Sequence, residues 1–149
     1  MTTIREVRCD DLLELTPLTI GQTVMAPLRD LMSIITEFPE YSLVCVSPGN
    51  RITGYVAAYN TGEGAERHCA INEIHYLRAE MFLMLMKAIE ERAEEHKVFY
   101  VEVDLLSEYD EVFVGMGYTR HREYFDVIGG ELVNKSILRK NLSGGDLHL

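Results

Sequence analysis

Residues 69–77 read CAINEIHYL, residues 78–96 read RAEMFLMLMKAIEERAEEH, and residues 97–106 read KVFYVEVDLL. In the middle stretch apolar residues recur every three or four positions, which is the period of a helix with one buried stripe. The two outer stretches alternate between apolar and polar residues or run apolar, as strands do. Strands joined by a helix within one sheet lie nearly parallel, with the helix over one face. The sequence therefore predicts a strand–helix–strand crossover at residues 69–106.

The junction between the first of these strands and the helix, residues 77–80, is where we expect a ligand. The N–H groups of a first helical turn have no acceptor within the helix. Together with the helix dipole they attract anions. An anionic ligand at this junction is therefore the first functional hypothesis.

The chain has 149 residues, 47% of them hydrophobic, and a formal net charge of −10. We expect one domain at residues 1–142 and a flexible tail at residues 143–149. No apolar run approaches the ~20 residues of a membrane helix, and the first residues lack the layout of a secretory signal, so we expect a cytoplasmic protein without membrane contact. The negative charge repels phosphate backbones, so nucleic-acid binding is not expected. Cys9, Cys45 and Cys69 lack the spacing of a metal site, and we predict neither a metal ion nor a disulfide.

Patterns typical of strands and helices fill the rest of the chain, bounded by proline, glycine and serine. A first helix is expected to end at Pro17, and Ser107 is expected to cap a later helix that Gly117 ends. Gly54 inside a strand predicts a bulge or a twist. The expected order is a strand at 3–8, helices at 12–15 and 27–38, a hairpin at 41–59, the crossover, a helix at 107–116 and a hairpin at 118–141. The fold class is therefore α/β or α+β.

This order of elements resembles the GNAT acetyltransferase superfamily, and several stretches are similar to one branch of it, the catalytic subunits of the NatB protein N-terminal acetyltransferase. The similar stretches are MTTIR at 1–5, CDDL at 9–12, FPEYSLVCV at 38–46, SPGNRITGYV at 47–56, FYVEV at 99–103, MGY at 116–118 and REYF at 122–125. The resemblance implies the GNAT fold, a mixed central sheet of about seven strands with helices on both faces. It also implies transfer of an acetyl group from acetyl-CoA to a protein α-amino group.

In the GNAT family the junction after the fourth strand carries an Arg/Gln and Gly pattern that holds the pyrophosphate of acetyl-CoA. The junction of this chain has no glycine and is several residues shorter than the family loop. It also puts the carboxylate of Glu80 where a phosphate would come near, although such a carboxylate is otherwise a favourable partner of the helix dipole. The residues that the resemblance implies for cofactor binding are Ile74, Tyr76, Leu77, Arg78 and Ala79, of which only Arg78 is of the expected type.

Acetyl transfer needs a proton donor for the leaving thiolate and a base for the acceptor amine. The family's tyrosine donor falls on Phe113, which cannot give a proton, whereas Tyr109 lies one helical turn earlier on the same face and is the predicted donor. The alternative for Tyr109 is an aromatic ring that packs with its hydroxyl at the rim. Candidates for the base are Glu73 and His75, which share a face of their strand, and Glu102 on the next strand. Each of the three can equally be a surface residue or a satisfied structural one.

Tyr124 and Phe125 match an aromatic pair that lines the peptide groove in the family, although aromatics on strands are more often core residues. The resemblance further implies that residues 12–38 admit a protein or peptide N-terminus and dock a large helical auxiliary subunit. Two other hypotheses stay open. A catalytically inactive GNAT-fold protein acting as a binding or regulatory subunit would explain Phe113 and the missing glycines. Transfer to a small amine such as a polyamine would suit the acidic charge.

Overall fold

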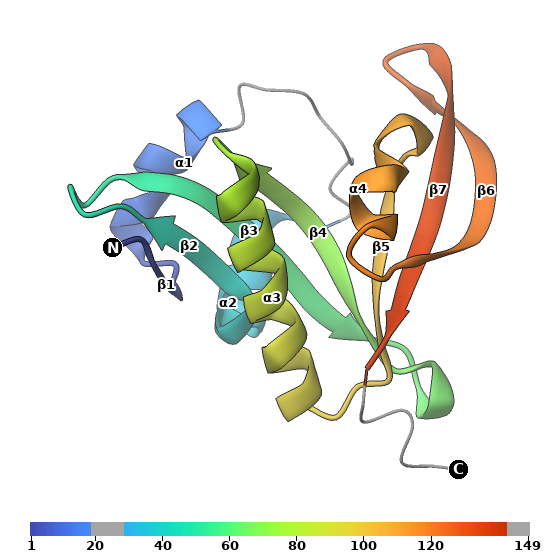
Figure 1. Cartoon of the computed structure of the whole chain (residues 1–149), viewed down its shortest axis with the longest axis horizontal. Coiled ribbons are helices and arrows are strands. Elements are labelled where there is room, and N and C mark those ends of the chain that lie inside the picture. The colour runs from blue at the N-terminus through green and yellow to red at the C-terminus, as the bar shows by residue number, and fades with distance from the viewer. Residues whose placement is uncertain (19–28, 143–149) are drawn as a thin grey trace.

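The computed structural model describes residues 1–18 and 29–142, which form one seven-stranded sheet flanked by helices (Figure 1). The strands cross the sheet in the order β1-β2-β3-β4-β5-β7-β6, so β1 and β6 are the two edges. All neighbours are antiparallel except β4 and β5, which are parallel. The strands are β1 (Thr3–Glu6), β2 (Ser42–Val46), β3 (Ile52–Thr61), β4 (His68–Tyr76), β5 (Tyr100–Leu106), β6 (Thr119–Ile128) and β7 (Glu131–Asn141). The mixed seven-stranded sheet implied by the sequence is confirmed.

Helices cover both faces of this sheet, as expected. The helices are α1 (Leu12–Leu18), α2 (Leu31–Glu37), α3 (Ala79–Glu95) and α4 (Asp110–Val114). Figure 1 shows α3 and α4 in front of the sheet and α1 and α2 behind it. The parallel strands β4 and β5 are joined by α3, so the predicted crossover is confirmed, with helix bounds within one residue of the expected ones.

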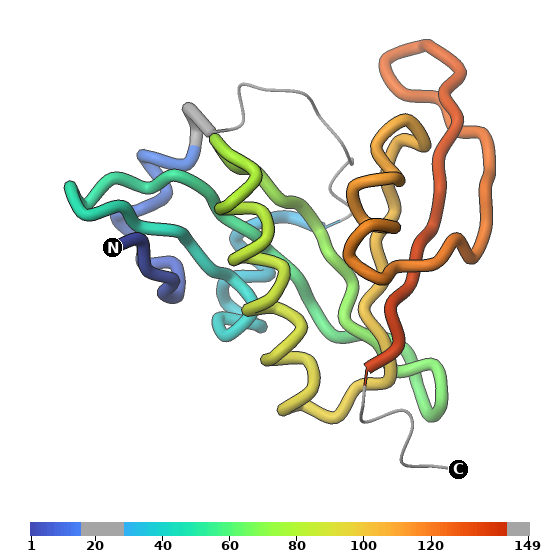
Figure 2. Tube along the Cα trace, in the orientation of Figure 1, coloured from blue at the N-terminus to red at the C-terminus, as the bar shows by residue number. Residues whose placement is uncertain are grey.

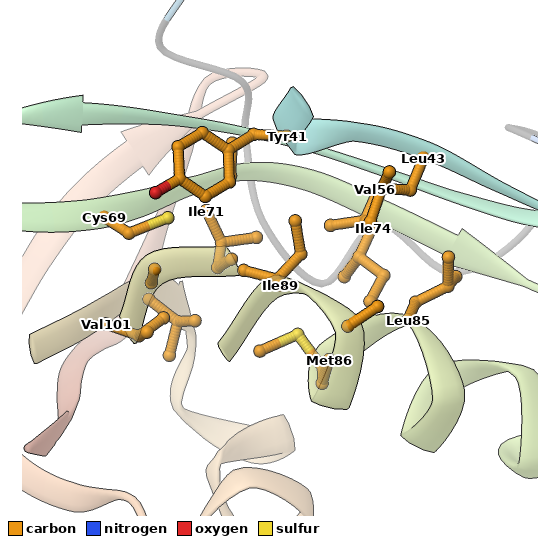
Figure 3. Close-up of a cluster of buried hydrophobic side chains, with 14 of the residues drawn as sticks. Tyr41, Leu43, Val56, Cys69, Ile71, Ile74, Leu85, Met86, Ile89 and Val101 are labelled. Carbon is orange, nitrogen blue, oxygen red and sulfur yellow. The ribbon is translucent and has the colours of Figure 1, made fainter. Parts of the chain in front are cut away.

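The largest core lies between α3 and the sheet. The apolar stripe of α3 supplies Leu85, Met86 and Ile89, none of which has exposed surface. Figure 3 shows these side chains pointing at the strands, where they meet Leu43, Val56, Ile71 and Ile74. Burying a side chain of this size contributes about 1.5–3 kcal/mol. The apolar stripe predicted from the sequence therefore anchors α3 to the sheet.

Gly54 allows α3 to approach β3 closely. A Cβ atom at this position would lie 3.2 Å from Leu85 Cδ1 and 3.1 Å from the carbonyl oxygen of His75. The register between β2 and β3 also shifts beside Gly54, between Cys45 and Val46. The bulge that the sequence predicts near Gly54 is therefore present.

The closing hairpin turns at two glycines. Gly129 and Gly130 have φ angles of 58° and 82° and join Ile128 of β6 directly to Glu131 of β7. A two-residue hairpin turn with both φ angles positive matches the twist of the strands and favours glycine. Figure 2 shows the resulting β6–β7 hairpin on the side of the molecule away from α1. The closing hairpin predicted at residues 118–141 is confirmed.

Three predicted helix boundaries are wrong. Helix α1 ends at Leu18, one residue beyond Pro17. A proline lacks an N–H group and crowds the carbonyl group four residues earlier, which weakens a helix without always ending it at the proline itself. Ser107 does not cap α4: it begins a 3₁₀ turn, Ser107–Tyr109, and its Oγ lies 2.7 Å from Ser136 Oγ. The second helix begins at Leu31, with Asp30 as its N-cap, so residues 29 and 30 of the expected helix 27–38 are not helical. Residues 27 and 28 and the expected tail at residues 143–149 lie outside the described residues. Among the residues described, no helix has the length and apolar content to cross a membrane.

Candidate functional site

The strands β4 and β5 part from each other after a short parallel ladder. They pair only at His68↔Tyr100, Cys69↔Val101 and Ala70↔Glu102, whereas β4 stays paired to β3 as far as Tyr76. Beyond the ladder β5 pairs with β7 alone. Within the described part of the chain, residues 73–76 therefore have no strand partner on their β5 side. Their backbone N–H and C=O groups on that edge can pair with an extended ligand.

A bulge at Asn72 sets which side chains face which side of β4. Ala57 pairs with Glu73 while Ala58 pairs with Ile71, which leaves Asn72 as the extra residue. Asn72 is 2% exposed, and its side chain binds the backbone of Arg29 twice, through Oδ1 at 2.9 Å and Nδ2 at 3.1 Å. After the bulge, Ile74 packs in the core under α3.

Glu73 and His75 lie together on the opposite face of β4, as the sequence predicts. Glu73 is 8% exposed, and its Oε2 lies 3.6 Å from Nε2 of His75. Tyr55 of β3 pairs with His75, and its ring stacks on the imidazole with 4.8 Å between centroids. Burial raises the pKa of the Tyr55 hydroxyl and the charge of Glu73 raises it further, so Tyr55 stays a hydrogen-bond donor.

The arrangement of Glu73 and His75 suits proton transfer. His75 Nε2 is buried and has no hydrogen-bond partner among the residues that the structure describes, although the Glu73 carboxylate is close. A buried ring nitrogen without a partner is costly unless a ligand or a water satisfies it. The pair can therefore accept a proton from a substrate amine on this face, directly or through one water.

Glu102, the third candidate base, is held in ion pairs instead. Its carboxylate accepts a hydrogen bond from Arg139 Nε at 2.8 Å and lies 3.4 Å from His68 Nε2. Burial alone would raise the pKa of Glu102, but the hydrogen bonds from His68 and Arg139 outweigh it and lower the pKa. A carboxylate held in its charged form by two cationic partners is poorly suited to take a proton from a substrate ammonium group.

The junction between β4 and α3 is short. Only Leu77 and Arg78 separate Tyr76, the last residue of β4, from Ala79, the first of α3. The N–H group of Leu77 donates to the carbonyl oxygen of Thr53 at 3.0 Å. The first-turn amides of Ala79 and Glu80 are left without an intrahelical acceptor.

Tyr109 lies on the other side of the sheet from Glu73 and His75. It is half-buried against the core under α3, and burial followed by the proximity of Glu108 and Tyr76 raises the pKa of its hydroxyl. Phe113 is 2% exposed, and its ring meets Phe82 edge-on at 5.2 Å. The structure therefore keeps Tyr109 apart from the two base candidates.

The residues predicted to bind substrate also point in different directions. Tyr124 donates a hydrogen bond of 2.6 Å to Asp104 Oδ2, beside the buried amine of Lys135, which is 3.4 Å from Asp104 Oδ1. Burial raises the pKa of Tyr124, and Asp104 raises it further. Phe125 is 72% exposed on the opposite side of β6, because successive side chains of a strand alternate. No group of three His, Cys, Asp or Glu side chains suited to a metal ion occurs in the part of the chain that the structure describes.

Comparison with known proteins agrees with this geometry. No family model matches the chain. The catalytic subunit NAA20 of the N-terminal acetyltransferase B complex of Arabidopsis thaliana is 26% identical over 140 residues, which cover 88% of this chain and 80% of that protein. The crystal structure of Chaetomium thermophilum Naa20 with a bisubstrate analogue superposes with a TM-score of 0.82, at 15% identity over 97% of this chain and 89% of that one. The NatB complex bound to CoA and MES gives a TM-score of 0.75, at 20% identity over 94% and 99%.

The chain has the GNAT fold and resembles the NatB catalytic subunit. In this GNAT-fold chain, sequence reasoning missed Tyr55 and Asn72. Tyr55 carries no local signal, because its role follows from its pairing with His75 on another strand. Asn72 stands in the sequence beside Glu73, but the bulge that turns it toward Arg29 appears only once the register with β3 is known.

Proposed function

We propose that the protein is an acetyl-CoA-dependent N-acetyltransferase that acts on the α-amino group of a protein or peptide N-terminus. The observation that carries this proposal is the combination on one strand of an edge without a strand partner at residues 73–76 and the Glu73–His75 pair on the face opposite α3. The relatives support it. One is the catalytic subunit of an N-terminal acetyltransferase complex, and the similar crystal structures were determined with a bisubstrate analogue or with CoA.

The residues at the β4–β5 opening fit part of acetyl-CoA well. The pantetheine arm contains amides, and the backbone groups of residues 73–76 on the β5 side can pair with them as a neighbouring strand would. Tyr76 and Phe82, whose rings are 5.0 Å apart, provide apolar surface beside this edge. For the phosphates the junction offers Arg78 and the first-turn amides of α3. When bound, acetyl-CoA supplies an activated thioester carbonyl.

The chain's own side chains would then handle the protons. Glu73 and His75 take a proton from the acceptor ammonium and leave a neutral amine. The ring of Tyr55, stacked on the imidazole, holds His75 in position. Tyr109, whose raised pKa keeps its hydroxyl protonated near neutral pH, is positioned beside Tyr76 to donate a proton.

The acceptor peptide would lie against the face of the sheet that carries Glu73, with Tyr124 as part of its wall. Lys135 and Asp104 fix the hydroxyl of Tyr124 there. For a helical auxiliary subunit, the exposed apolar side chains on this side are Leu13 of α1 at 86% and Met32 of α2 at 50%. Residues 19–28, which are part of the stretch 12–38 that the resemblance implies for docking, lie outside the described residues. The cytoplasmic location stays a prediction of the sequence.

The test is transfer of an isotope-labelled acetyl group from acetyl-CoA to two versions of one lysine-containing peptide. One version has a free α-amino group, and in the other that group is formylated. We expect label only on the free α-amino group, located by tandem mass spectrometry. Label on the lysine alone would contradict the proposed acceptor, and no label on either peptide at saturating acetyl-CoA would favour the non-catalytic alternative.

A further inference from the structure

The start of α4 is tied to the β6–β7 hairpin by a buried carboxylate. Asp110, the first residue of α4, is 4% exposed. Its Oδ2 accepts a hydrogen bond of 2.7 Å from Arg120 Nε of β6 and a longer one, of 3.4 Å, from Ser136 Oγ of β7. The Oγ of Ser136 also lies 2.7 Å from the Oγ of Ser107. The carboxylate therefore joins three elements, α4, β6 and β7.

The stability of the fold does not by itself call for a charged group at this place. Taking a carboxylate out of water is costly, and apolar residues of similar volume often stabilise a core as well or better. A helix of five residues, Asp110–Val114, is too short to be stable on its own. It is held by Asp110 at its start and by Phe113, whose ring meets Tyr118 edge-on at 5.4 Å, near its end. A buried hydrogen-bonded network fixes one arrangement more strictly than apolar packing does.

Tyr109 lies between the residues that this network holds. It directly precedes Asp110 and ends the 3₁₀ turn that Ser107 begins. Its ring packs against the core under α3, close enough to Tyr76 for the two side chains to interact electrostatically. The direction of the Tyr109 side chain therefore depends on how firmly Ser107 and Asp110 are held.

We propose that Asp110 is a positioning residue for acetyl transfer, which holds Tyr109 where its hydroxyl can protonate the leaving thiolate. The inference rests on the proposed function, because it concerns the proton donor of that reaction. Tyr109 gives the proton of its O–H bond to the sulfur as the C–S bond of the thioester breaks and the C–N bond of the amide forms. The amine nitrogen releases a proton to the Glu73–His75 pair, and water returns one to the tyrosinate. Asp110 touches neither substrate and acts through Tyr109.

A double-mutant cycle on kcat tests this role. The variants are Tyr109→Phe, Asp110→Asn and the two combined, assayed with acetyl-CoA and the peptide that has a free α-amino group. We expect Tyr109→Phe to lower kcat by about 10²-fold, as for loss of a general acid. Asp110→Asn should lower kcat by about tenfold because the hydroxyl is misplaced, with the KM of the peptide and the Kd of acetyl-CoA changed by less than about twofold. In the combined variant Asp110→Asn should cost nothing further, because residues that act as one unit are not additive.

The outcomes separate the inference from the proposed function. Losses of kcat that multiply in the combined variant would show that Asp110 does not act through Tyr109 and would overturn the inference. An unchanged kcat in either single variant would overturn it as well, and in both cases transfer to the α-amino group would still stand. No transfer by the unaltered protein would overturn the proposed function, and the inference with it.

A second buried ion pair of the same kind controls for a merely structural role. Asp11 is 5% exposed, and Arg5 of β1 donates to its Oδ2 at 2.7 Å. This pair lies at the β1 edge, on the other side of the sheet from α4 and β6 (Figure 1). We expect Asp11→Asn and Asp110→Asn to lower the urea midpoint by similar amounts, and only Asp110→Asn to lower kcat. An equal fall of kcat in both would assign the effect to lost stability and overturn the inference.

Ser136→Ala gives the same test while the charge stays in place, and keeps the inference testable if Asp110→Asn does not fold. It removes the second donor to Asp110 and the contact with Ser107. We expect kcat to fall by about threefold in Ser136→Ala alone and not to fall further when Ser136→Ala is added to Tyr109→Phe. A threefold loss that persists in the Tyr109→Phe background would contradict a role through Tyr109.

Discussion

The carboxylate of Glu73 lies 3.6 Å from the imidazole of His75 on one face of β4, and the same strand offers an unpaired backbone edge. Two substrates can therefore meet at β4, one along its edge and one on its face. The bulge at Asn72 makes this possible, because it sends Glu73 and Ile74 to opposite faces next to the opening.

Glu73→Gln should abolish most of the proton transfer without disturbing the fold. The amide keeps the shape of the side chain but cannot accept a proton. We expect kcat to fall by about 10²-fold or more, as for loss of a general base. Calorimetry should give an unchanged affinity for the acetyl donor. The control Glu91→Gln should leave kcat within about twofold of the unaltered protein. If Glu73→Gln does so as well, Glu73 is not the base.

Asn72→Ala should weaken the attachment of Arg29 to β4, next to Glu73. The amide side chain makes two hydrogen bonds with the backbone of Arg29, and its removal leaves those groups to find water. We expect the free energy of unfolding to fall by about 1–3 kcal/mol in urea titrations. A loss below about 0.5 kcal/mol would mean that the two hydrogen bonds with Arg29 contribute little to stability.

Gly54→Ala should separate α3 from the sheet. The added methyl group would lie 3.2 Å from Leu85 Cδ1 and 3.4 Å from Met81 Cβ. Overpacking of this kind costs about 1–3 kcal/mol. Gly49→Ala is the matched control, since no atom lies within 4 Å of its Cβ position. Urea titrations in which the two variants are equally stable would contradict the close approach described at Gly54.

The ion pair between His68 and Glu102, at the closed end of the β4–β5 opening, should make stability depend on pH. Burial alone would lower the pKa of His68, but hydrogen bonds with Glu102 and the carbonyl of Glu66 raise it above the usual 6.5. Stabilisation from a raised histidine pKa is complete below the unfolded value and is lost as the pH rises through the folded one. From about pH 6 to about pH 8 the free energy of unfolding should therefore fall by up to about 1 kcal/mol. Urea titrations of His68→Gln at several pH values provide the test. If the free energy of unfolding of this variant falls with pH as steeply as that of the unaltered protein, His68 is not the source of the pH dependence.

Local patterns explain why much of the fold could be predicted. The helical period of residues 78–96 and the glycines at 129 and 130 each specify one element, and both elements are present. Properties that depend on pairing between distant segments could not be predicted. Tyr55 joins Glu73 only through the register of β3 with β4, and Ser107 prefers Ser136 of β7 to the cap of its own helix. The separation of Tyr124 from Phe125 was accessible in principle, because alternation along a strand already places neighbours on opposite faces.

Hydrogen–deuterium exchange of β4 with and without S-acetylpantetheine tests the central claim most directly. The claim is that the edge of β4 facing β5 holds the acyl donor. We predict that peptides covering residues 71–76 exchange more slowly when the thioester is bound, whereas peptides from β2, which is paired on both sides, do not change. Unchanged exchange at residues 71–76 under saturating ligand would contradict the account.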